Sequence, residues 1–233
     1  ENHRGPDFHV DCGLGKAMQR GGTISMIRPT HEVVPRRDCL GEGHIPENAP
    51  YVIDGVSFEF MLAPNTEAPA EMTVYVKDYK TLVNAEISNH TLHNTLAPRG
   101  TQARDARLWW KALDRLMERY GAEIEALCAT HHWPTWGNAD CRRFLAEQRD
   151  TYKFIHDQTV RLINKGYVMA EIAAEFEKPG FLPALLTNNW HNRGYYGTVS
   201  HNVRAIYQKY IGWYDMNPAN LNKRNADLNP SGQ

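Results

Sequence analysis

Three short segments of this sequence carry side chains that could bind a divalent metal ion. Glu67 lies in the segment TEAPAEM, Glu86 in NAE and His131 in THHW, and each segment follows an apolar run. In a layered α/β fold, loops at one edge of a sheet converge, so these groups can meet there. Carboxylate oxygens and imidazole nitrogens are ligands for zinc or a similar ion.

The same residues also have a simpler interpretation. Glu67, Glu71 and Glu86 could be surface carboxylates and His131 a loop histidine, and the residue types alone leave both interpretations open. A sulfur-ligated site is not indicated, because the cysteines lie far apart and form no CxxC pair. They are Cys12, Cys39, Cys128 and Cys141.

The elements that would position these groups begin with a β-rich region over residues 22–83. Short runs rich in β-branched and aromatic residues, separated by turn signals, predict strands at 23–27, 51–53, 56–62, 72–76 and 81–83. Asp54-Gly55, between two apolar runs, predicts a tight hairpin because glycine readily adopts the positive φ that such a turn requires.

Beyond Gly100 the apolar spacing becomes helical and predicts a helix that stops at Gly121. One more strand is expected at 124–129, followed by a loop at Pro134. Further helices are expected at 138–166, 170–176 and 201–213. The change of composition near residue 137 predicts a boundary between a domain at 1–137 and a helical domain at 138–233.

Composition excludes some classes of function. The 233 residues include 26 basic and 27 acidic side chains, spread along the chain, so no field favours nucleic acid or an anionic membrane. No stretch approaches the roughly 20 apolar residues of a membrane span, and residues 1–11 lack a signal pattern. Localisation stays open. The sequon at Asn89 competes with a functional reason for the polar residues around it.

Longer sequence words resemble one known family. They are, in this order, TEAPAEM, NAE, HTLHN, RGTQARDA, HHWPTWGNAD, YKFIHDQT and RGYYGTVSHN, and the similarity around them covers residues 13–221. Together they resemble the alkyl sulfatases of the metallo-β-lactamase superfamily. The resemblance implies an incomplete αββα metallo-β-lactamase-like α/β domain, followed by an all-α domain that forms a homodimer.

The resemblance further implies a site with two zinc ions, whose activated water hydrolyses an alkyl sulfate such as dodecyl sulfate. Glu67, Glu86 and His131 match ligands of the family, and Glu86 is expected to bridge the two ions and to be essential for catalysis. Glu71 and His132 are expected to support the ligands through hydrogen bonds or packing.

An organic sulfate carries a negative charge that a guanidinium can hold, and Arg99 is the candidate. The alternative for Arg99 is a surface salt bridge to Asp105. Four residues of the last word could hydrogen-bond the sulfate or could pack between the domains: Tyr195, Tyr196, His201 and Asn202.

The superfamily's His-x-His-x-Asp-His run is absent, and the isolated His9, His31 and His44 do not replace it. We therefore expect a missing N-terminal part of the catalytic domain, and little hydrolysis by this chain alone. A second hypothesis is a catalytically inert oligomerisation module formed by the helices. A third, a hydrolase of lactones or thioesters, does not explain the words TEAPAEM and RGYYGTVSHN.

Overall fold

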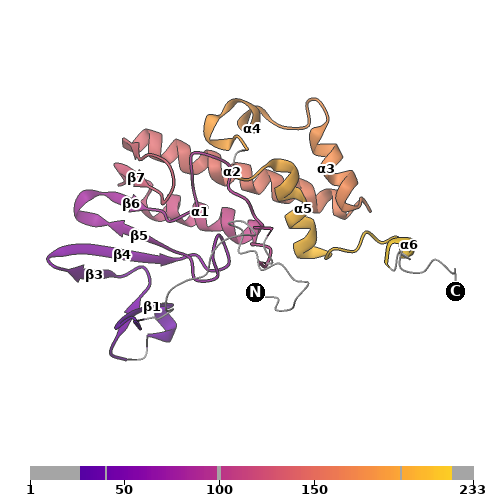
Figure 1. Ribbon diagram of the computed structural model, residues 1–233. Helices are drawn as coiled ribbons and strands as arrows, with labels where there is room; N and C mark the ends of the chain where they lie inside the picture. Colours follow the sequence, from indigo (N-terminus) through magenta and orange to yellow (C-terminus); the bar gives the residue numbers. More distant parts are fainter. Residues whose placement is uncertain (1–26, 40, 99–100, 195, 222–233) are drawn as a thin grey trace, which may run out of the picture.

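The computed structural model describes residues 27–39, 41–98, 101–194 and 196–221. Its main sheet has six strands in sequential order, antiparallel except for the parallel pair β6 and β7 (Figure 1). They are β3 (Pro50–Ile53), β4 (Val56–Leu62), β5 (Met72–Val76), β6 (Thr81–Val83), β7 (Ala126–Cys128) and β8 (Thr135–Trp136). A small parallel sheet joins β1 (Glu32–Val34) to β2 (His44–Pro46).

The hairpin between β3 and β4 forms where it was predicted. Asp54 and Gly55 both have positive φ, at 49° and 82°, and Ile53 pairs with Val56 across the turn. Positive φ at both central residues gives the twist that two antiparallel strands need. Glycine has no side chain to oppose this backbone conformation.

Helices follow and flank the sheet. They are α1 (Ala106–Tyr120), α2 (Asn138–Ile163), α3 (Met169–Glu177), α4 (Ala184–Asn188), α5 (Val199–Tyr210) and α6 (Pro218–Leu221). Asp105 caps the N-terminus of α1, because its carboxylate accepts hydrogen bonds from the backbone N–H groups of Arg107 and Leu108. Single 3₁₀ turns lie at η1 (Arg36–Asp38), η2 (Lys77–Tyr79) and η3 (Trp190–Asn192).

The core is continuous from the sheet into the helices. Tyr75 and Leu82 belong to it on the sheet side, and Trp109 of α1 is fully buried and stacks on Tyr152 of α2, with ring centroids 4.8 Å apart. α1 and α2 pack along each other (Figure 1). The domain boundary near residue 137, where α2 begins, stays a prediction.

The opposite face of the sheet is also apolar. The register places Phe58, Val76 and Trp136 on that face together with Val74 and Val83. Trp136 is 68% exposed and Val83 38% exposed. A sheet with apolar residues on both faces has the pattern of one that is covered on both sides.

Most predicted elements are confirmed, and several short ones were not predicted. No local pattern predicted β1, β2, β8, α4 or α6, which have five residues or fewer. The strand expected at 23–27 lies almost wholly outside the described residues, and so does Cys12. The other three cysteines are free thiols. No helix among the described residues is long and apolar enough to cross a membrane.

Candidate metal centre

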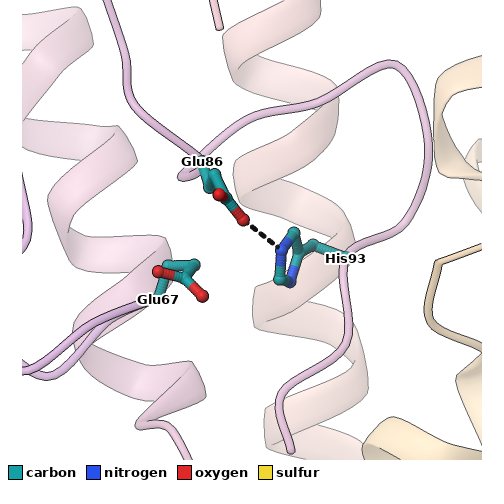
Figure 2. A group of neighbouring side chains, drawn as sticks. All are labelled: Glu67, Glu86 and His93. Atoms are coloured by element: carbon teal, nitrogen blue, oxygen red, sulfur yellow. Dashed lines mark hydrogen bonds and ion pairs between the residues drawn. The ribbon is translucent and has the colours of Figure 1, made fainter. Parts of the chain in front are cut away.

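Two loops at one edge of the sheet bring Glu67, Glu86 and His93 together. Glu67 lies between β4 and β5, while Glu86 and His93 lie in the long segment between β6 and α1. Each offers one ligand atom, and these atoms lie within 4.8 Å of one another (Figure 2). β4 and β6 both pair antiparallel with β5, and β6 pairs parallel with β7, so β4, β6 and β7 run in the same direction. The segments that follow these three strands therefore leave the sheet at the same edge.

Glu86 lies between two imidazoles. Its Oε2 is 2.8 Å from Nε2 of His93, and its Oε1 is 3.3 Å from Nε2 of His131. Burial would raise the pKa of Glu86, but the contacts with the two histidines outweigh burial and lower the pKa below its ordinary value. Thus the carboxylate is ionised, and each oxygen faces a different imidazole.

The backbone explains why Glu86 and His131 meet. Asn84 donates its backbone N–H to the carbonyl of Cys128 at 2.7 Å, and Thr130 donates its own to the carbonyl of Ala85 at 3.0 Å. These bonds continue the ladder between β6 and β7 beyond the ends of both strands. The two loops therefore leave the sheet side by side.

His93 has a contact that fits a bound cation. Its side chain is 1% exposed, Nε2 faces Glu86 at 2.8 Å, and Nδ1 faces the carbonyl oxygen of Asn94 at 2.8 Å. A neutral imidazole has one N–H and can donate to only one of these oxygens. Burial lowers the pKa of His93 and so disfavours a second proton. Nε2 of His93 and the carboxylate of Glu86 would hold a divalent cation, while Nδ1–H would be donated to the carbonyl.

Glu67 has a cation and a second carboxyl beside it. Nη2 of Arg104 forms an ion pair with its Oε1, and both side chains are largely buried. Glu71 is 8% exposed. Burial and the neighbouring charge of Glu67 raise the pKa of Glu71 to about 7. The negative charge of Glu67 therefore lies next to the permanent positive charge of Arg104.

The loop after β7 places its two histidines differently. His131 is 46% exposed beside Glu86, with its ring centroid 5.7 Å from that of Tyr196. His132 has a φ of 70°, and its Nε2 lies 3.0 Å from Oγ1 of Thr91. The two neighbouring side chains thus face different groups.

The residues expected to bind sulfate lie at different depths. Tyr196 is 49% exposed, and its ring contacts that of His93 edge-on at 4.6 Å. His201 donates Nε2–H to the carbonyl of Leu96 at 2.6 Å. Asn202 is fully buried, accepts from the backbone N–H of Thr95 and donates to the carbonyl of His93, each at 2.9 Å. Arg99 and Tyr195 lie outside the described residues.

The helical half of the chain, from residue 138 onward, forms backbone hydrogen bonds with the loop that carries His93. Leu92 donates its N–H to the carbonyl of Arg193 at 2.9 Å, and Gly197 donates its own to the carbonyl of Leu92 at 2.8 Å. A Cβ atom on Gly197 would lie only 2.5 Å from the backbone nitrogen of Asn94. The segment before α5 therefore packs directly on the backbone of the site.

Sequence reasoning missed His93 and Arg104. Both lie within words used for the resemblance, HTLHN and RGTQARDA, but no role was assigned to either. The available signal was a histidine seven residues after Glu86 and a second arginine in a polar segment. Neither follows a predicted strand directly.

Known proteins similar to this chain are alkyl sulfatases. A family model described as alkyl sulfatase dimerisation matches residues 168–229. Alkyl/aryl-sulfatase BDS1 of Saccharomyces cerevisiae is 47% identical over 214 residues, which cover 92% of this chain and 31% of that protein. Over nearly its whole length, this chain is similar to alkyl sulfatases. A linear primary-alkylsulfatase of Pseudomonas sp is 45% identical over 91% of the chain and 29% of its own length.

A solved alkyl sulfatase supports the fold. The stereoselective inverting sec-alkylsulfatase Pisa1 from Pseudomonas sp. superposes with a TM-score of 0.74 at 42% identity, over 78% of this chain and 28% of that one. The resemblance to alkyl sulfatases and the fold class are confirmed: an α/β region with a mixed sheet, followed by helices. The chain spans about a third of the length of the curated relatives it matches.

Proposed function

We propose that this chain supplies part of the active site of an enzyme that hydrolyses alkyl sulfate esters, such as dodecyl sulfate, to an alcohol and sulfate. The observation that carries the proposal is the arrangement of Glu67, Glu86 and His93, with His131 on the second oxygen of Glu86. The names of the relatives, which are alkylsulfatases, supply the substrate class.

Two zinc ions are the proposed cofactor. Glu67, Glu86 and His131 would hold them as the family resemblance implies, with His93 as an additional nitrogen ligand suggested by the geometry. Glu86 suits a bridging role because each of its oxygens faces a different imidazole. The bound ions would supply Lewis acidity and make hydroxide available near neutral pH.

The protein side chains would hold the ester in place. Tyr196 is exposed beside His93 and His131, so its hydroxyl is available to a sulfate oxygen. Arg99 would pair with the sulfate charge, and this role rests on the resemblance. Tyr195, His201 and Asn202 are proposed as further sulfate contacts or as supports of the loop.

We also propose a homodimer. The match to the alkyl sulfatase dimerisation family covers residues 168–229, which include α3, α4 and α5. Exposed apolar side chains after α5, Ile211 and Trp213, are available for contact with a second copy. An inert oligomerisation module is less favoured, because such a module has no need for two carboxylates and two imidazoles at one place.

The test uses paired glutamate variants. Glu86→Gln removes an anionic candidate ligand at the site, whereas Glu59→Gln removes a carboxylate of β4 that pairs with Arg119 of α1. Zinc content and release of sulfate from dodecyl sulfate are measured on the native assembly that contains this chain. We expect about two zinc ions per site and at least a hundredfold loss of turnover for Glu86→Gln alone. Unchanged turnover in that variant refutes the proposal.

A further inference from the structure

Arg104 connects two of the segments that carry the candidate ligands. Its Nη2 pairs with Glu67, and its Nη1 donates to the backbone oxygen and to Oδ1 of Asn94 at 2.9 and 2.7 Å. Its backbone is held as well, since Arg104 donates its N–H to the carbonyl of Thr95 at 2.9 Å. A single guanidinium thus spans the gap between the Glu67 loop and the His93 loop.

The contact with Asn94 reaches His93. The carbonyl oxygen of Asn94 is also 2.8 Å from Nδ1 of His93, so it can accept from Arg104 and from the imidazole together. When Nδ1–H donates to this carbonyl, Nε2 keeps its lone pair for a ligand. Nη1 of Arg104 also lies 3.4 Å from Nδ1 of His93. Arg104 therefore influences the orientation of the His93 ring without bonding to its metal-facing nitrogen, Nε2.

The chemistry of arginine suits this place. The guanidinium presents donors in a rigid planar fork, and its charge does not depend on pH. Lysine has a single ammonium, which can replace the charge but cannot reproduce the fork across two segments. The Arg104 side chain is 12% exposed, so water has limited access to complete the contacts that a substitution breaks.

We propose that Arg104 is a positioning residue of the metal centre, which orients the Glu67 carboxylate directly and the His93 imidazole through the carbonyl of Asn94. This inference rests on the proposed metal-binding function. It assigns to Arg104 a role that acts through the geometry of two candidate ligands.

A positioning role and a purely electrostatic role predict opposite effects on metal affinity. A positive charge beside a cation site repels the cation, so removing it should tighten binding if charge is its only effect. Loss of a group that orients a ligand typically weakens metal binding ten- to a hundredfold. Because lysine keeps the charge, Arg104→Lys separates the two effects.

The experiment is a Zn²⁺ titration by competition with a chromophoric chelator, on the whole chain and on three variants. We expect Arg104→Lys and Arg104→Ala each to bind zinc about ten- to a hundredfold more weakly than the unmodified chain. The matched control is Arg119→Lys, because Arg119 bonds a carboxylate of Glu59 and the carbonyl of Asn48 in the same manner away from the site. The control should bind zinc normally.

A metal-independent readout separates this inference from the proposed function. Nitrogen-15 NMR of the metal-free chain reports the protonation of each His93 ring nitrogen, and we expect the Nδ1 proton to be lost or averaged in Arg104→Lys. If the unmodified chain binds no zinc while the NMR change occurs, the proposed function fails and the positioning role stands. Unchanged His93 signals, or normal zinc affinity in Arg104→Lys, refute the positioning role. If Arg104→Ala does not fold, Arg104→Lys carries the test.

Discussion

Asn202→Ala should destabilise the protein because the side chain joins α5 to the loop of the site. Its Oδ1 accepts from the backbone N–H of Thr95, and its Nδ2 donates to the carbonyl of His93, each at 2.9 Å in a fully buried place. Alanine leaves the buried N–H of Thr95 without this partner and the carbonyl of His93 with only the hydroxyl of Tyr152, at 3.5 Å. Because an unsatisfied buried group costs about 1–3 kcal/mol, we expect a loss of about 3 kcal/mol in the free energy of unfolding.

The assay is thermal and urea unfolding together with zinc titration. For a chain of this size, the expected loss corresponds to a fall of roughly 10 °C in Tm. The matched control is Asn192→Ala, since Asn192 is equally buried, accepts from Gln148 and donates to the carbonyl of Leu185, all within the helical half. Both variants should lose stability, but only Asn202→Ala should also bind zinc more weakly.

Two results would refute this reasoning. A loss below about 1 kcal/mol in Asn202→Ala would mean that the buried hydrogen bonds contribute little. Equal zinc affinity in the two alanine variants would mean that α5 does not hold the His93 loop. If Asn202→Ala does not fold, Asn202→Ser, which keeps a small polar side chain, is measured in its place.

Three further outcomes are expected. His90 lies between two aromatic rings, and burial, followed by the charges of neighbouring histidines, lowers its pKa from 6.5 to about 4. The stabilising contribution of neutral His90 is therefore complete above pH 6.5, and lowering the pH towards 4 should remove up to about 3 kcal/mol from the free energy of unfolding. Urea unfolding at a series of pH values measures this loss. The His90→Asn variant should lack this pH dependence. Gly197→Ala should lower Tm by several degrees, because its Cβ would overlap the backbone of Asn94, and an unchanged Tm would contradict the observed packing. His131→Ala and His93→Ala should each weaken zinc binding at least tenfold in calorimetric titrations; normal affinity in either would remove that histidine from the ligand set.

The regular elements could be predicted because their patterns are local. The runs that form β4 and β5 are β-branched and aromatic, and the helical spacing of α1 ends at Gly121 as expected. The hairpin at Asp54-Gly55 needed only two residues for its prediction. β1 and β8, with three and two residues, carry too few positions for a period to show.

The candidate site was predictable where its residues follow strands. Glu67, Glu86 and His131 come after β4, β6 and β7, which run parallel and end at one edge. His93 and Arg104 lie in an irregular segment between β6 and α1, where no period indicates position. Contacts from the helical half, about a hundred residues later, fix that segment, and a single sequence does not encode them as a local pattern.

The most direct test of the account is zinc K-edge X-ray absorption on the protein loaded with Zn²⁺, together with the Glu86→Gln variant. We expect nitrogen and oxygen ligands at about 2.0–2.2 Å, imidazole scattering from histidine and no sulfur, with the zinc signal largely lost in the variant. Sulfur scattering, or a zinc environment that Glu86→Gln leaves unchanged, would contradict the claim that these carboxylates and imidazoles form a metal centre.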